Sequence, residues 1–204
     1  MLEVCKKGPI FEPKFIFYKT SSWKKISKES QKSFEFLLKE FKKNIEVFDE
    51  PSYFKDIPKY HQIIHETDMA NSFQDYYKKS KKKMGKKLVE AIERGYKYSA
   101  KEYVDAVDFM KQSYKSYSEV FEDYYGIITP ASIGVADKGL LSTGSPELST
   151  IWTYMGLPTI SLPLLSGENN LPLGVQLIGG KLDDLRFLAS ANWLEKNCKE
   201  KNDK

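Results

Sequence analysis

The sequence predicts an α/β protein with a mixed sheet and outer helices, and three observations support this fold class. Residues 1–125 hold 45 charged side chains and residues 126–196 hold only 10, so the second segment predicts buried strands and the first predicts amphipathic helices outside them. Near the N-terminus, aromatic and β-branched runs flank a segment of helical spacing, as in a strand-helix-strand unit. Two apolar runs around SGENN (166–170) predict a hairpin.

The first elements follow from local patterns. Lys14–Thr20 (KFIFYKT) is aromatic and β-branched and predicts a strand, and Asn44–Phe48 predicts a second, shorter one. Between them, Ser27–Phe41 has apolar residues at helical spacing. Residues 58–125 are helical in pattern; Gly95 ends one helix, and Ser99 with Glu102 forms a capping box at the start of another.

From residue 126 onward, short uncharged segments predict strands and a loop. We expect a strand at Gly126–Pro130, a loop at Ala131–Gly144, and a helix capped by Ser145 that stops near Met155 before Gly156. Two strands at Thr159–Leu165 and Leu173–Ile178 pair as the hairpin, and a last helix starts at Asp183 or Asp184. Its inward side chains are Leu185, Leu188, Ala191 and Leu194.

The length suits one domain or part of a larger one. We expect a partial domain over 1–196, followed by a frayed tail over 197–204. Its parts are 1–57 (strand-helix-strand), 58–125 (a helical segment) and 126–196 (sheet and terminal helix).

The composition places the chain among globular proteins of a reducing compartment. Hydrophobic residues make up 41%, which is enough to bury a core. Cys5 and Cys198 are too few for a disulfide scaffold and lack zinc-site spacing, so we expect free thiols and a cytoplasmic location; no signal peptide is visible.

Leu148–Gly167 carries no charge, but its prolines and hydroxyls favour a buried helix-turn-strand over a membrane span.

Seven lysines within Lys78–Lys87 (KKSKKKMGKK) raise the alternative of a nucleic-acid binder. Lysine lacks the bidentate fork of arginine, and no arginine lies in the cluster. A solvated surface is therefore the favoured interpretation, and we expect no nucleic-acid or membrane partner.

His61 and His65 could share one helix face, but no third ligand is signalled, so we expect no metal and no cofactor.

Several motifs in the last third occur in a specific order: GIITPASIGVADKGLLSTGSP (126–146), IWTYMGLPTISLPL (151–164), LPLGVQLIGG (171–180) and DDLRFLASANWL (183–194). This series resembles the amidase signature family of amide hydrolases. The resemblance implies the C-terminal part of an α/β/α sandwich. The family's serine nucleophile, cis-serine and buried lysine sit upstream in a Gly/Ser-rich stretch that nothing here matches, and the adjacent pair Ser21-Ser22 lacks glycines. We therefore assign no catalytic residue.

The resemblance makes residues 1–196 a partial amidase-like domain and places the helical segment 58–125 on the substrate side. It also implies a role in building the substrate pocket. Ser142, Thr143 and Gly144 would form small polar walls and Trp152 an apolar one; the alternative is that Ser145 is only a cap and Trp152 only core. Gln176 is interpreted as structural. The amidotransferase members of the family bind their substrate carboxylate through an arginine on the helix corresponding to Leu88–Gly95. Here the register of Arg94 does not clearly fit, which favours a general amidase.

The predicted function is thus hydrolysis of a C–N amide bond in a small-molecule substrate, by a portion that is inactive alone. The missing N-terminal half would join in cis or in trans, and a homo-oligomer is possible. The alternative is a non-catalytic binding or scaffold protein derived from the amidase fold.

Overall fold

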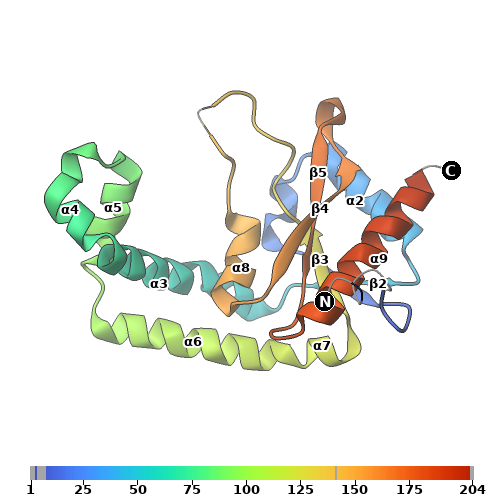
Figure 1. Cartoon of the computed structure of the whole chain (residues 1–204), viewed down its shortest axis with the longest axis horizontal. Helices are drawn as coiled ribbons and strands as arrows, with labels where there is room; N and C mark the ends of the chain where they lie inside the picture. The colour runs from blue at the N-terminus through green and yellow to red at the C-terminus, as the bar shows by residue number, and fades with distance from the viewer. Residues whose placement is uncertain (1–2, 4–7, 141, 203–204) are drawn as a thin grey trace. The chain divides into compact units, whose positions relative to one another are not determined.

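Five strands form one mixed sheet in the computed structural model, which describes residues 3, 8–140 and 142–202 (Figure 1). The spatial order is β2-β1-β3-β5-β4; β1 is parallel to β2 and β3, and β5 is antiparallel to β3 and β4. The strands are β1 (Phe15–Lys19), β2 (Ile45–Asp49), β3 (Gly126–Pro130), β4 (Thr159–Ser166) and β5 (Pro172–Ile178). All five predicted strands are confirmed, and so is the hairpin of β4 and β5.

The chain divides into two compact units. The first unit, which contains the sheet, comprises the chain up to Ser52 and from Tyr117 onward, and the second runs from Tyr53 to Ser116. Short 3-10 turns η1 (Ser21–Lys25) and η4 (Glu168–Asn170) belong to the first unit. The first unit thus joins segments that are far apart in the sequence.

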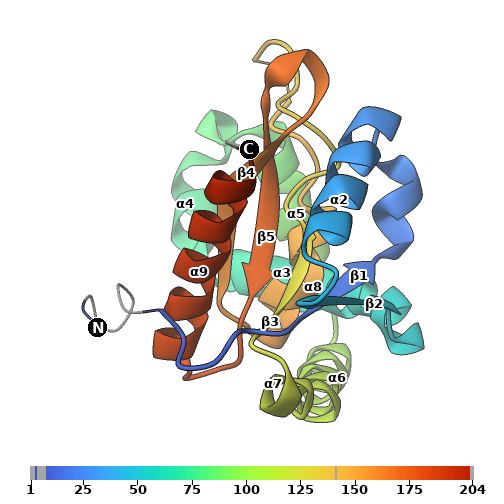
Figure 2. The ribbon, with the colours of Figure 1, turned by 90° about the vertical axis from the view of Figure 1, so that its right-hand side faces the viewer.

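Helices α2 (Lys28–Glu40) and α9 (Asp184–Asn202) lie on the same side of the sheet (Figure 2). The amide of Ser30 donates to the Oγ of Ser27, the N-cap of α2, at 3.2 Å, which satisfies one free donor of the first turn. Between helices and sheet lies an apolar core that includes Phe15, Phe17, Phe34, Leu37, Val175, Leu177, Phe187 and Leu194.

The last helix differs from the prediction in two respects. It continues to Asn202 and so reaches into the segment 197–204 that was expected to be a tail. Cys198 is buried and packs into the apolar core, which explains why the helix extends, whereas Cys5 lies outside the described residues. Leu185, expected to point inward, is 44% exposed, while Ala191 and Leu194 are buried as predicted.

Helix α8 (Glu147–Met155) begins two residues after Ser145, with Pro146 as its N-cap. The Oγ of Ser145 still accepts a hydrogen bond from the Glu147 amide at 3.3 Å, so the serine satisfies a donor in front of the helix. Gly156 ends the helix with φ +65°, the left-handed conformation that glycine adopts without strain. The short helix α7 (Val120–Asp123) leads into β3.

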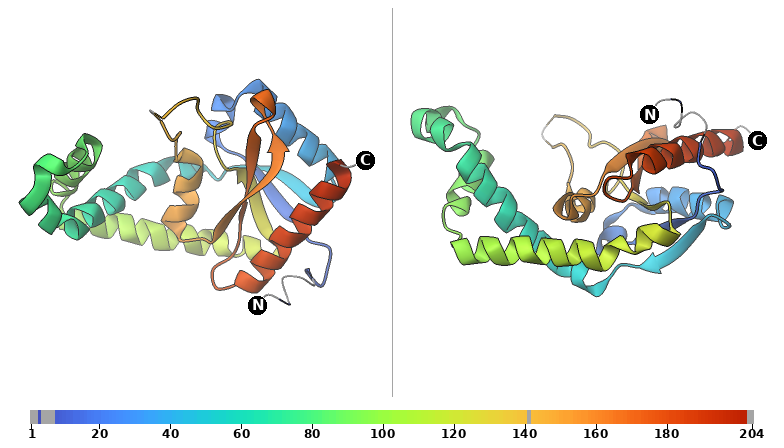
Figure 3. Two further views of the ribbon diagram at one scale, coloured as in Figure 1. Left: turned by 45° about the horizontal axis from the view of Figure 1, so that its top comes forward. Right: turned by 60° about the horizontal axis from the view of Figure 1, so that its bottom comes forward.

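The second unit is helical, as predicted for this segment. It contains η2 (Ser52–Asp56) from Tyr53 onward, α3 (Ile57–Ser72), α4 (Gln74–Ser80), η3 (Lys81–Lys83), α5 (Lys86–Gly95) and most of α6 (Ala100–Ser118). Helices α4 and α5 lie beside each other at the end of α3 (Figure 3). The capping box is confirmed: the Glu102 amide donates to Ser99 Oγ at 3.2 Å, and the Ser99 amide donates to Glu102 Oε2 at 2.8 Å.

Within the described part of the chain, none of the helices is both long and apolar enough to cross a membrane.

Candidate functional site

The site lies at one edge of the sheet in the first unit. The parallel strands β1 and β3 both end at this edge, so the segments that follow them, Thr20–Lys25 and 131–146, leave the sheet together. The turn of the β4–β5 hairpin reaches the same edge, because Ser166 pairs with Pro172 and Pro130 pairs with Val175. Open α/β sheets commonly bind ligands outside the carboxyl ends of their parallel strands.

Polar side chains form a row across the sheet beside α8. Thr129 on β3 is completely buried and Gln176 on β5 is 5% exposed. The Thr129 hydroxyl donates to Gln176 Oε1 at 3.4 Å, and Gln176 Nε2 donates to Ser149 Oγ at 3.5 Å. These bonds are long, so the row is only weakly tied together. Its groups bind through hydroxyl and amide dipoles and carry no charge.

Gly174 makes room beside this row. A Cβ atom at this position would lie 2.7 Å from Ser161 Oγ and 3.0 Å from the Ala131 Cβ, closer than side chains normally approach. Ser161 itself is exposed. Because Gly174 has no side chain, the Ser161 hydroxyl and the Ala131 methyl group pack directly against its backbone. We call Thr129, Ser149, Ser161, Gly174 and Gln176 the polar floor.

We expect Gly174→Ala to lower the free energy of unfolding by about 1–3 kcal/mol, since the added methyl group overpacks the floor. The double variant Gly174→Ala/Ser161→Ala removes the nearer of the two obstacles and should recover part of the loss. Urea denaturation of the two variants and the parent chain measures the difference. An equal loss in both variants would show that Ser161 does not oppose the methyl group.

The loop beyond β3 carries three of the four predicted pocket residues. Ser142, Thr143 and Gly144 are exposed, and the Gly144 amide donates to Ser142 Oγ at 3.1 Å. Trp152 lies elsewhere: its side chain is fully buried on α8, with its ring centroid 6.4 Å from that of Tyr117. The structure thus brings the three loop residues together at the surface and holds the indole in the core.

An ion pair joins the two segments that leave the sheet edge. Lys25 Nζ, in η1, donates to Glu147 Oε2 at 2.9 Å, at the first turn of α8. The Ser22 hydroxyl, the Lys25 ammonium and the Ser145 hydroxyl lower the pKa of Glu147, and burial opposes them. Glu147 is therefore a carboxylate at neutral pH.

This ion pair was not predicted, because 122 residues separate Lys25 from Glu147. The only sequence signals were the serine pair Ser21-Ser22 and the acid at the helix start. A general base that activates a serine works best with a pKa near the working pH, and the lowered pKa of Glu147 makes it a weak base. The pair thus positions segments, and we assign no nucleophile to Ser22.

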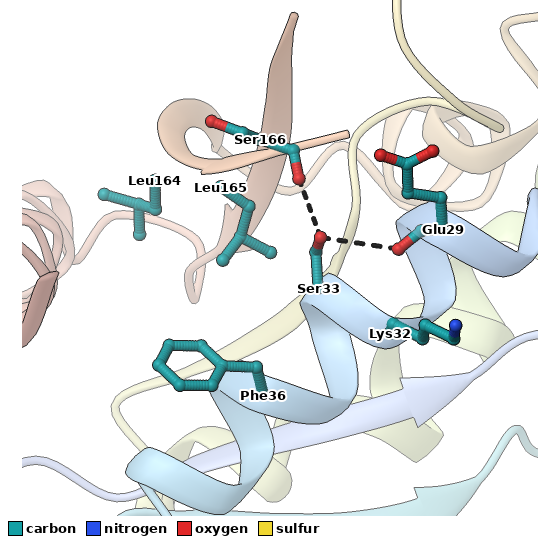
Figure 4. Close-up of a pocket in the computed structure, with 7 residues that line it drawn as sticks. All are labelled: Glu29, Lys32, Ser33, Phe36, Leu164, Leu165 and Ser166. Atoms are coloured by element: carbon teal, nitrogen blue, oxygen red, sulfur yellow. Dashed lines mark hydrogen bonds between the residues drawn. The ribbon is translucent and has the colours of Figure 1, made fainter. Parts of the chain in front are cut away.

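A separate groove of about 520 Å³ lies between α2 and β4 (Figure 4). The Ser33 hydroxyl crosses it and donates to the carbonyl oxygen of Ser166 at 2.7 Å. Its charged lining residues, Glu29 and Lys32, are both exposed. Because the lining holds no buried titratable group, this groove offers less chemistry than the edge near α8. The lining residues are Glu29, Lys32, Ser33, Phe36, Leu164, Leu165 and Ser166.

The histidine pair of α3 lies in the second unit. The rings of His61 and His65 stack with centroids 5.4 Å apart, and burial together with the neighbouring His65 lowers the pKa of His61. Among the described residues, no group of three or more His, Cys, Asp or Glu side chains is arranged to hold a metal ion.

Arg94, which the sequence analysis considered as a ligand for the substrate carboxylate, forms an ion pair with the carboxylate of Glu66 in the same unit. Its Nε and Nη2 donate to Glu66 Oε1 at 2.9 and 2.6 Å, and Tyr98 donates to Glu66 Oε2 at 3.3 Å. Glu66 is 4% exposed. Burial alone would raise the pKa of Glu66, but hydrogen bonds from Arg94, Gln62 and Tyr98 hold it below its usual value.

The lowered pKa of Glu66 predicts that the second unit loses stability in acid. A carboxyl group with a lower pKa in the folded state stabilises the fold fully above its unfolded-state pKa, about 4.3, and loses this effect as the pH falls through the folded-state pKa. Amide hydrogen exchange of α3 and α5 at a series of pH values measures it, after correction for the intrinsic exchange rate. Glu66→Gln should flatten this pH dependence, and an unchanged profile would contradict the role of Glu66.

Comparison with known proteins gives one family. The family model described as Amidase matches residues 14–188. A glutamyl-tRNA(Gln) amidotransferase subunit from Alkaliphilus metalliredigens is 34% identical over 100 residues, which cover 46% of this chain and 20% of that protein. Fatty-acid amide hydrolase 2-A of Danio rerio is 33% identical over 95 residues, covering 43% of this chain and 18% of that protein.

Solved structures give the same fold. A crystal structure of an amidase superposes with a TM-score of 0.79 at 20% identity, covering 92% of this chain and 46% of that one. A bacterial aryl acylamidase of the amidase signature family gives 0.72 at 14% identity, covering 99% and 47%. At this identity the likeness concerns the fold, and the chain spans about half the length of these structures and about a fifth of the curated relatives.

Proposed function

This chain belongs to the amidase family, and we propose that it forms the C-terminal portion of an enzyme that hydrolyses a C–N amide bond. In this proposal the serine nucleophile and its lysine come from another portion of the fold, in cis or in trans. The completed fold would be an α/β/α sandwich, to which this chain contributes the mixed sheet and its outer helices.

One observation carries the proposal: nearly all of this chain superposes on less than half of an amidase structure, with a TM-score of 0.79. The order of the sequence motifs between residues 126 and 194 supports the C-terminal position. The chemistry of the sheet edge agrees with a supporting role, since the polar floor offers uncharged hydrogen-bonding groups and the nearby carboxylate of Glu147 is paired with Lys25.

We propose that Ser142, Thr143 and Gly144 form the rim of the substrate mouth. Their exposure and the loop that follows β3 support contact with a ligand. Trp152 is fully buried, which supports an indirect role: its indole would hold α8, and with it the rim, in position. The substrate is a small molecule with an amide group, which suits a surface of hydroxyls and backbone amides.

The test is to produce the 204 residues together with the segment encoded directly upstream, both as one chain and as two, and to assay a panel of amides. We expect turnover only when both portions are present. Thr143→Lys should raise KM more than it lowers kcat if the rim binds substrate. Lys39→Gln, an exposed change on α2, is the matched control. Turnover that is insensitive to the rim variant would remove the rim from the proposal.

A further inference from the structure

The second unit carries a strongly basic surface that lies outside the polar floor and the rim. Residues 74–88 contain seven lysines and one acid, Asp75, which gives a local net charge of 7 − 1 = +6. All seven lysines are exposed. They follow one another through the end of α4, η3 and the start of α5. We call this set the lysine tip: Lys78, Lys79, Lys81, Lys82, Lys83, Lys86 and Lys87.

Intramolecular pairing neutralises little of this charge. Lys81 Nζ lies 2.6 Å from Glu93 Oε1, and Lys86 Nζ lies 3.9 Å from Glu90 Oε1. Both pairs are substantially exposed, so solvent screens them. Lys82 and Lys83 extend from a short turn that buries no residue. The lysine tip therefore keeps a net positive field toward the solvent.

Two aromatic side chains stand exposed beside the lysines. Helix α4 buries no residue, although it carries two tyrosines. Tyr77 is held, since its hydroxyl donates to Glu93 Oε1 at 2.9 Å and Lys81 Nζ lies 4.8 Å from its ring centroid. Tyr76 is 67% exposed and Phe73 is 38% exposed, with ring centroids 6.4 Å apart. Tyr77 is thus held against α5, whereas Tyr76 and part of the Phe73 ring face the solvent.

We propose that the lysine tip, together with Phe73 and Tyr76, binds the surface of an anionic lipid bilayer. Clustered lysines attract acidic head groups, and exposed aromatic rings settle at the boundary between head groups and acyl chains. From the sequence we expected no membrane partner, and there only a spanning segment was considered; the binding proposed here is peripheral and does not require such a segment. It is also independent of the amidase proposal, since no residue of the polar floor or the rim takes part.

Lipid is favoured over nucleic acid by the residue types. The lysine tip contains no arginine, and the guanidinium of the nearby Arg94 is bound to Glu66. The tip therefore offers no guanidinium group for a bidentate hydrogen bond to a phosphate or to the edge of a base. A diffuse layer of anionic head groups needs only accumulated charge, which lysine supplies as well as arginine.

The test uses the whole chain in a sedimentation assay with phosphatidylcholine vesicles, with and without about one third phosphatidylserine. We expect binding to the anionic vesicles alone, weakened by high salt. Lys79→Gln/Lys82→Gln/Lys83→Gln should lower the affinity about tenfold or more. The matched control, Lys28→Gln/Lys32→Gln/Lys39→Gln on α2, makes the same change in net charge at exposed positions and should bind normally. Equal losses in both triple variants would overturn the assignment to the tip.

A second variant separates lipid from other anions. Phe73→Ser/Tyr76→Ser keeps every lysine and should weaken vesicle binding, because the rings no longer enter the interface. Inorganic phosphate at matched ionic strength should compete no better than chloride. If the chain binds single-stranded RNA or duplex DNA more tightly than anionic vesicles at the same salt, or binds neutral vesicles equally well, the proposal is wrong.

Discussion

Truncation of Trp152 should cost the first unit about 3–5 kcal/mol in its free energy of unfolding. The indole is fully buried on α8 and packs beside Tyr117, so Trp152→Ala leaves a large cavity that the neighbours cannot fill. Chemical denaturation followed by circular dichroism measures the loss. This change is informative because the sequence left two roles for Trp152, a pocket wall and a core residue.

Trp152→Phe is the matched control, since it keeps an aromatic ring in the same space and should cost much less than the alanine variant. A loss below about 1 kcal/mol for Trp152→Ala would contradict the burial of the indole, because such small effects are typical of surface positions. A full-sized loss would support Trp152 as a core residue of the first unit rather than a wall of the pocket.

Gly95→Ala should disrupt the second unit to a similar extent. A Cβ at this position would lie 2.0 Å from the backbone oxygen of Glu66 and 2.6 Å from its carbonyl carbon. These are backbone atoms of α3 and cannot rotate away, so α5 would have to move off α3. We expect a loss of about 3 kcal/mol or more, at the upper end of overpacking effects. Hydrogen exchange of the α3 and α5 amides reports it.

Gly85→Ala provides the comparison within the same unit. A Cβ at Gly85 meets nothing within 4 Å, and its φ of −64° suits alanine, so the change should be nearly neutral. If Gly95→Ala were as mild as Gly85→Ala, the close approach of α3 and α5 would be incorrect.

Local chemistry explains which elements were predictable. Gly126–Pro130 is an uncharged run, Gly156 ends α8 with a positive φ, and Ser99 with Glu102 caps α6; each signal lies within a few residues. The spatial order of the strands was not predicted, because pairing of β3 with β1 and β5 depends on contacts between distant segments. The extent of α9 was missed for the same reason, since Cys198 is buried by packing in the core.

In the candidate site, too, local features were predictable from the sequence and contacts between distant segments were not. The exposed loop with Ser142, Thr143 and Gly144 was located from family motifs, and its contact with a substrate stays a prediction. Gln176 contacts Ser149, Glu147 contacts Lys25 and Arg94 contacts Glu66, at sequence separations of 27, 122 and 28 residues, and nothing in the sequence indicates these pairs. Gln176, interpreted as structural, contacts Thr129 on β3 and Ser149 on α8 through long hydrogen bonds of 3.4 and 3.5 Å.

We propose that the nucleophile of the amidase lies outside these 204 residues. The most direct measurement is to incubate the chain alone with the amide panel and with a fluorophosphonate that labels activated serines. We expect no turnover and no labelling. Turnover by the chain alone that disappears in Ser22→Ala, the serine beside Lys25 and Glu147, would contradict it.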